Sequence, residues 1–84
     1  MANIVVYTTQ QCPYCAAAKA LLRHKAVFFE EIDVGADPGL REKMIEESGR
    51  RTVPQIFING SPIGGFEELR ALDQGGKLDR LLAA

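Results

Sequence analysis

Two cysteines, separated by two residues, constrain this chain more than any other feature of its sequence. The stretch Cys12-Pro13-Tyr14-Cys15 contains both cysteines of the chain, at a spacing that allows them to react with each other. A disulfide across this spacing closes a loop of about four residues and stabilises by roughly 2 kcal/mol, against about 3 kcal/mol for fifteen residues. The spacing therefore favours redox chemistry over structural cross-linking. No metal site is expected, because zinc needs about four ligands and His24 is the one histidine.

The length and charge of the chain narrow the class of protein further. With 84 residues, one compact domain spanning residues 1–84 is expected. A net charge of −1 provides no basic surface for nucleic acid or for a membrane, and no apolar run is long enough for a membrane helix. No secretory signal follows Met1, so a cytoplasmic protein with a small-molecule or protein substrate is expected.

The first part of the chain predicts a β-α-β unit. Asn3–Thr8 is β-branched and apolar, as expected of a central strand. Pro13 suits the first helical position, strong helix formers continue to Lys25, and Cys12 then lies at the N-cap. Val27–Val34 returns to strand character. Its candidate core residues are Phe28, Phe29, Ile32 and Val34.

The second part predicts a helix, a hairpin and a helical end. A helix is expected over Pro38–Ser48, with Gly49 as a left-handed stop. A strand over Gln55–Asn59 leads through an Asn59-Gly60 turn into a short strand over Ser61–Ile63. Helices follow over Phe66–Leu72 and Lys77–Leu82. The order β-α-β-α-β-β-α predicts an α/β fold, with a four-stranded mixed sheet flanked by helices on both faces.

The two cysteines are expected to have different roles. A thiolate at a helix N-terminus is stabilised by free N–H groups and the positive end of the helix dipole, which makes Cys12 the candidate nucleophile. Cys15 lies one turn later on the same face and is placed to attack a mixed disulfide formed at Cys12. The alternative is that both cysteines are simply small buried apolar residues.

Three motifs in this order resemble the glutaredoxins, of the dithiol class within the thioredoxin-fold superfamily. They are Cys12-Pro13-Tyr14-Cys15, Thr52-Val53-Pro54, and Gly64-Gly65 before the acidic helix start at Glu67 and Glu68, and the resemblance covers nearly the whole chain. It implies a thioredoxin-like fold and a glutathione-dependent thiol-disulfide oxidoreductase that reduces protein disulfides and glutathionylated proteins. It also implies a monomer with glutathione as co-substrate and no tightly bound cofactor.

The resemblance also implies where glutathione binds. The Val53–Pro54 bond is expected to be cis and to face Cys12, so that the backbone of Val53 pairs with the tripeptide like an added strand. The start of the helix that begins at Phe66 would hold the γ-glutamyl end of glutathione. Arg41 would hold the carboxylate of the glycine end, with Arg51 as a second possible cation. The implied glutathione site comprises Tyr14, Arg41, Thr52, Val53, Pro54, Gly65, Phe66, Glu67 and Glu68.

Departures from the family pattern leave other activities open. Thr9 stands where many glutaredoxins have a lysine, and glutamates stand where aspartate is common. One alternative is a [2Fe–2S] cluster carrier that uses Cys12 and glutathione as ligands, although Pro13 argues against it. Another is a glutaredoxin-like protein recharged by thioredoxin reductase, and a third is a non-catalytic binding module.

Overall fold

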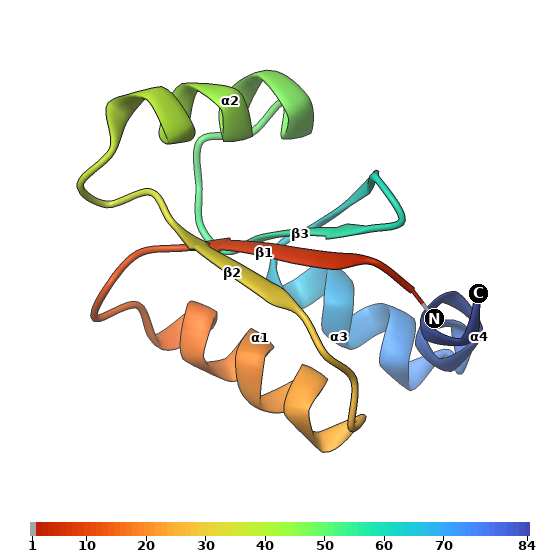
Figure 1. The fold of residues 1–84 in the computed structure, drawn as a ribbon. Coiled ribbons are helices and arrows are strands. Elements are labelled where there is room, and N and C mark those ends of the chain that lie inside the picture. The colour runs from red at the N-terminus through yellow and green to blue at the C-terminus, as the bar shows by residue number, and fades with distance from the viewer. Residues whose placement is uncertain (1) are drawn as a thin grey trace.

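The computed structural model describes residues 2–84, which form one mixed sheet between helices (Figure 1). Within these residues the sheet has four strands, and helices lie on both of its faces. The elements are β1 (Ile4–Thr8), α1 (Pro13–His24), β2 (Glu30–Asp33), α2 (Pro38–Ser48), β3 (Gln55–Ile58), β4 (Ser61–Gly64), α3 (Phe66–Gln74) and α4 (Lys77–Ala83). The predicted α/β fold is therefore confirmed, with the last two helices each slightly longer than expected.

Strand β1 lies in the middle of the sheet, whose order is β2-β1-β3-β4. It pairs in parallel with β2, which requires a crossover, and α1 makes that connection. It pairs antiparallel with β3, and β3 pairs antiparallel with β4 through the predicted hairpin. Asn59 and Gly60 have φ values of 52° and 80°, as a two-residue hairpin turn with left-handed residues requires.

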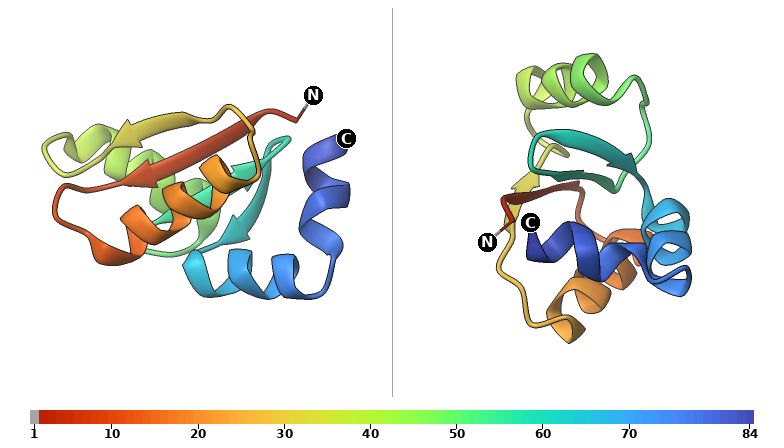
Figure 2. Two further views of the ribbon diagram at one scale, coloured as in Figure 1. Left: turned by 90° about the horizontal axis from the view of Figure 1, so that it is seen from below. Right: turned by 90° about the vertical axis from the view of Figure 1, so that its right-hand side faces the viewer.

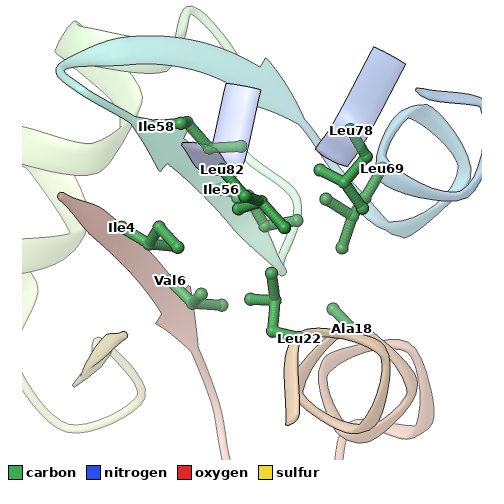
Figure 3. Packing of buried hydrophobic residues seen from close by; sticks show 9 residues of the cluster. All are labelled: Ile4, Val6, Ala18, Leu22, Ile56, Ile58, Leu69, Leu78 and Leu82. Carbon is green, nitrogen blue, oxygen red and sulfur yellow. The ribbon is translucent and has the colours of Figure 1, made fainter. Parts of the chain in front are cut away.

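The larger core lies between the sheet and helices α1, α3 and α4, which share one face in both views of Figure 2. Alternate residues of a strand point to opposite faces, so β1 and β3 each send every second side chain into this core. Figure 3 shows these side chains meeting those of the helices. The buried members are Ile4, Val6, Ala18, Leu22, Ile56, Ile58, Leu69, Leu78 and Leu82.

A smaller core lies on the other face of the sheet, under α2 (Figures 1 and 2). Its buried residues are Tyr7, Val34, Met44 and Phe57. Helix α2 occupies the predicted range, its N-terminus is capped by Asp37 through a 3.0 Å bond from Leu40 N, and it ends at Gly49 with φ of 74°. None of the helices in residues 2–84 is long and apolar enough to cross a membrane.

The strand predicted over Val27–Val34 is wrong at its start, because β2 begins only at Glu30. The register pairs Glu30 with Val5, and β1 itself begins at Ile4, so Val27 and Phe28 have no residue of β1 to pair with. The prediction that Phe28 belongs to the core is therefore wrong, because this side chain is 84% exposed. Phe29 and Ile32 are partly buried and Val34 is fully buried, as predicted.

Candidate active site

The start of α1 places the two cysteines in different environments. Cys12 is the N-cap residue, with extended backbone, and its Sγ accepts a 3.2 Å hydrogen bond from Cys15 N. Pro13 follows at the first helical position, where no N–H is needed. Cys12 is half-buried, whereas Cys15 is 1% exposed, and both are free thiols. The sulfur of Cys12 is therefore the accessible one.

Burial also separates the two thiols chemically. It raises the pKa of the Cys15 thiol to about 12, with a further contribution from the hydrogen bond to Cys12. A buried thiol is hard to ionise because the thiolate loses its hydration. Cys15 therefore stays protonated at neutral pH while Cys12, at the helix N-terminus, can meet a substrate.

The turn before β3 faces Cys12. The Val53–Pro54 bond is cis, as the resemblance implied, and Cys12 Sγ lies 3.9 Å from the carbonyl oxygen of Val53. Gln55, which is 1% exposed, fixes this turn by donating from Nε2 to Thr52 O at 2.8 Å and to Thr52 Oγ1 at 3.2 Å. The sequence analysis did not identify Gln55, although a glutamine at the start of a fully buried strand is a signal for such a role.

The glycine pair brings α3 close to the same turn. A Cβ on Gly65 would lie 3.3 Å from Pro54 O, and one on Gly64, whose φ is 117°, would lie 2.7 Å from Glu68 Oε1. Glu68 Oε1 accepts bonds from Gly65 N at 2.7 Å and from Arg50 Nη1 at 2.9 Å. The Gly65 N–H and the Arg50 guanidinium hold the pKa of the Glu68 carboxyl below its usual value. Glu68 thus closes the end of the helix, and Glu67 remains exposed.

These segments form a groove of about 170 Å³ beside Cys12. The ring of Tyr14, which is 61% exposed, lies 6.4 Å from the ring of Phe66, and these two side chains belong to one wall. The lining residues are Tyr14, Arg50, Thr52, Val53, Pro54, Gly65, Phe66, Glu67 and Glu68. The structure therefore brings together every residue of the implied glutathione site except Arg41.

The arginines are arranged differently from the sequence-based expectation. Arg41 Nη2 donates to Arg51 O at 3.1 Å, which braces α2 against the segment before the turn, and neither arginine lines the groove. Arg50, which was not singled out, does line it. No sequence signal distinguishes Arg50 from its neighbour Arg51, because Arg50 is placed at the groove by its pairing with Glu68, a residue far away in the sequence.

A second hollow, of about 510 Å³, lies on the other side of Cys12. Cys15, Lys19 and Thr9 line it from the side of α1, and Glu31 and Asp33 line it from β2. Within residues 2–84 no three metal-ligating side chains come together here or elsewhere. The arrangement is that of an accessible thiol between two hollows, with a protonated thiol one helical turn behind it.

Comparison with known proteins agrees with this arrangement. The family model described as Glutaredoxin matches residues 4–63. Glutaredoxin 3 of Escherichia coli K12 is 54% identical over 82 residues, covering 98% of this chain and 99% of the relative. The solution structure of glutaredoxin from Brucella melitensis has a TM-score of 0.84 at 54% identity, covering 95% of this chain and 87% of that one. The crystal structure of a buckwheat glutaredoxin–glutathione complex has a TM-score of 0.90 at 27% identity, covering 98% and 77%.

Three observations identify the family of this chain. They are the half-buried thiol beside a buried one, the turn that faces Cys12, and the matches over nearly the full length. The chain belongs to the glutaredoxin family and is a glutathione-dependent thiol-disulfide oxidoreductase with Cys12 and Cys15 as its active-site pair.

Proposed function

We propose that Cys12 is the attacking thiol and that the groove beside it binds the glutathione part of the substrate. The observation that carries this proposal is the 3.9 Å separation between Cys12 Sγ and Val53 O, since Val53 also lines the groove. A tripeptide lying along the turn would place its own sulfur next to Cys12. The structure of a buckwheat relative as a complex with glutathione supports the choice of ligand.

Each end of the groove offers chemistry that suits one end of an extended peptide. At α3, the N–H groups of the first turn and the helix dipole favour a carboxylate, which the γ-glutamyl end carries. The exposed carboxylate of Glu67 would receive the neighbouring ammonium group, because Glu68 already accepts from Gly65 N and Arg50. The backbone of Val53 would pair with the middle of the peptide. Arg41 stays the proposed partner of the glycine-end carboxylate, reached from beside the groove.

The proposed reaction has two exchanges. The Cys12 thiolate attacks the glutathione sulfur of a glutathionylated protein, so that a Cys12–glutathione bond forms and the protein thiolate leaves and takes up a proton. A second glutathione thiolate then attacks the glutathione sulfur of this mixed disulfide, releasing glutathione disulfide and the Cys12 thiolate. With a protein disulfide as substrate, Cys15 resolves the mixed disulfide instead, and glutathione later reduces the Cys12–Cys15 bond.

The proposal also covers the protein substrates, the oligomeric state and the cellular location. The protein substrates would be disulfide-bonded and glutathionylated proteins, because Cys12 lies in an open position between two hollows and accepts a bulky partner. We infer a monomer in the cytoplasm, where a reduced glutathione pool keeps such an enzyme supplied.

The proposal is tested by the glutathione-coupled reduction of a small glutathione mixed disulfide, followed through NADPH consumption by glutathione reductase. Wild type should turn over, Cys12→Ser should be inactive, and Cys15→Ser should keep a substantial rate. Glu67→Gln should raise the KM for the mixed disulfide several-fold, whereas Glu46→Gln, an exposed glutamate on α2, should not. Turnover by Cys12→Ser, or activity of wild type with thioredoxin reductase but not with glutathione, would contradict the proposal.

A further inference from the structure

The hollow on the other side of Cys12 has no part in the proposed binding of glutathione, yet it is lined by charged residues and by both active-site cysteines. Cys12, Cys15 and Lys19 contribute from α1, and Glu31 and Asp33 contribute from β2. Asp33 Oδ1 accepts from Gly35 N at 2.7 Å, which turns this carboxylate toward its own loop. Of the charged side chains that line the hollow, Lys19 and Glu31 are therefore the two whose contacts are considered next.

Lys19 is held in place rather than extended into solvent. Its Nζ lies 2.9 Å from Glu31 Oε2, and Thr8 Oγ1 donates to the same oxygen at 2.8 Å. Thr8 is 1% exposed, so Glu31 is anchored to the sheet, and the Lys19 side chain is only 22% exposed. The Lys19 ammonium and the Thr8 hydroxyl hold the pKa of the Glu31 carboxyl below its usual value. Glu31 thus stays charged at neutral pH.

Helical spacing places this fixed ammonium on the same side of α1 as Cys15. The two residues are four positions apart, so they lie one turn apart on one face, and both line the hollow. Burial opposes ionisation of the Cys15 thiol, and the Thr9 N–H and the Lys19 charge act in the opposite direction on its pKa. Thr9 acts through its backbone, so Lys19 is the side chain whose charge favours the Cys15 thiolate.

We propose that Lys19 is a positioning residue that stabilises the thiolate of Cys15 during the step that expels glutathione from Cys12. In that step the Cys15 thiol gives its proton to water in the hollow, and its thiolate attacks Cys12 Sγ of the mixed disulfide. The Cys12–Cys15 bond forms and the bond between Cys12 and glutathione breaks. Cys15 is oxidised, the glutathione sulfur is reduced, and glutathione leaves as a thiolate that takes up a proton. Glu31 holds the ammonium in place and does not receive the proton.

This inference rests on the proposed role of Cys12 as the attacking thiol, and the test separates the two. Reduced protein is mixed rapidly with excess glutathione disulfide, quenched with acid, and analysed by mass spectrometry. The first phase, which depends on glutathione disulfide concentration, reports the mixed disulfide at Cys12. The second phase, which does not depend on that concentration, reports closure by Cys15. Cys15→Ser should stop at the mixed disulfide.

Lys19→Met should slow closure by about three- to tenfold across the pH range in which Cys15 is mostly protonated, and added salt should narrow the difference. Its first phase should change by less than about twofold, since the Cys12 sulfur lies beyond the next turn. Lys19→Arg should restore most of the rate. Lys43→Met, an exposed lysine of α2 on the other face of the sheet, should behave like wild type.

Glu31→Gln distinguishes an effect of charge from an effect of structure. Both Glu31→Gln and Lys19→Met break the same ion pair, but only the lysine variant removes the positive charge. The amide oxygen of Glu31→Gln can still accept from Lys19 Nζ and Thr8 Oγ1 and so keep the ammonium in place, while the neutralising negative charge is gone. Closure in Glu31→Gln should therefore be at least as fast as in wild type. Two outcomes overturn the inference when the first phase is normal. One is slow closure in both variants, and the other is a closure rate in Lys19→Met within about 1.5-fold of the wild-type rate. A mixed disulfide that forms on Cys12→Ser and not on Cys15→Ser would instead refute the roles proposed for the cysteines.

Discussion

The redox centre and the groove beside it are built in opposite ways. The centre consists of four consecutive residues, Cys12-Pro13-Tyr14-Cys15, at the start of one helix. The groove takes its walls from α1, from the turn before β3 and from the start of α3, which are far apart in the sequence. The chemistry of this enzyme is therefore local, whereas its proposed recognition of glutathione depends on how the sheet and helices pack.

This difference predicts how the two regions respond to substitution. Changes at the turn or at α3 should alter stability or KM and leave the reactivity of Cys12 toward a small alkylating reagent nearly unchanged. Three such changes test the comparison, and each is followed by equilibrium unfolding, by KM for a glutathione mixed disulfide and by the alkylation rate of Cys12.

Gly64→Ala should have the largest effect. A Cβ there would lie 2.7 Å from Glu68 Oε1, in a backbone with φ of 117°, so Glu68 must leave its cap and the backbone is strained. We expect a loss of about 2 to 4 kcal/mol in the free energy of unfolding, from backbone strain and the lost cap together. The KM should rise several-fold, because Glu68 and Gly65 line the groove.

Gly60→Ala is the matched control for this substitution. Gly60 also has positive φ, of 80°, but a Cβ there would have no atom within 4 Å. It should destabilise by about 1 kcal/mol through backbone strain alone and leave KM unchanged. If Gly64→Ala were no worse than Gly60→Ala, the contact with Glu68 would not shape the groove.

Gln55→Leu should affect recognition more than stability. The substitution removes the two bonds that fix Thr52, and KM should rise about three- to tenfold as the turn loosens. It also removes Oε1, a buried acceptor that has no hydrogen-bond partner within residues 2–84. Stability should consequently stay within about 1 kcal/mol of wild type.

Gln74→Leu, an exposed glutamine at the far end of α3, controls for the added apolar side chain. It should leave KM unchanged. A large loss of stability in Gln55→Leu with normal KM would mean that Gln55 supports the core rather than the turn.

Glu68→Gln should have the smallest effect, and that effect should depend on pH. The folded-state pKa of Glu68 is lowered, so its charge stabilises the fold above the ordinary carboxyl pKa of 4.5. This stabilisation is lost as pH falls through the lowered value. We expect the free energy of unfolding of wild type to be about 0.5 to 1 kcal/mol larger than that of the variant at pH 7, which is the range of a helix cap. This difference should vanish at low pH.

Arg50→Met tests whether the Gly65 N–H or the Arg50 guanidinium contributes more to the lowered pKa of Glu68. The Gly65 N–H is the larger cause of the lowered pKa, so this variant should keep more than half of the pH-dependent difference. Unfolding in urea at several pH values measures both variants. Identical pH dependence of wild type and Glu68→Gln would show that the cap contributes no charge effect.

The redox centre, which is local in the sequence, was easier to predict than the groove, which is built from distant segments. The N-cap position of Cys12 depends on local signals, Pro13 and the helix-forming run after it, and it is present in the structure. The burial of Cys15 also requires the packing of the folded chain. The groove residues came from the family resemblance rather than from local pattern. The structure gathers most of them, but their roles in binding remain predictions.

The misses also have physical reasons. Phe28 lies in a stretch with strand composition, yet in the register of the sheet it comes before the first residue of β1. A one-dimensional sequence pattern does not contain this register. The pairing of Lys19 with Glu31 joins a helix to a neighbouring strand, and no spacing rule connects them. The distinction between Arg50 and Arg51 depends on the contact of Arg50 with Glu68, which joins two segments far apart in the sequence.

The central place of β1 has a consequence for the newly made chain. Both thiols leave the ribosome soon after β1, but Ile4 must pair with Ile58 before the middle of the sheet exists. Domains form as units and distant pairings come late, so both thiols stay exposed until β3 has been made. Cys15 is then not yet buried, so burial does not yet separate it from Cys12 as a nucleophile. The difference in burial between them, on which the enzyme relies, is acquired only with the last strands.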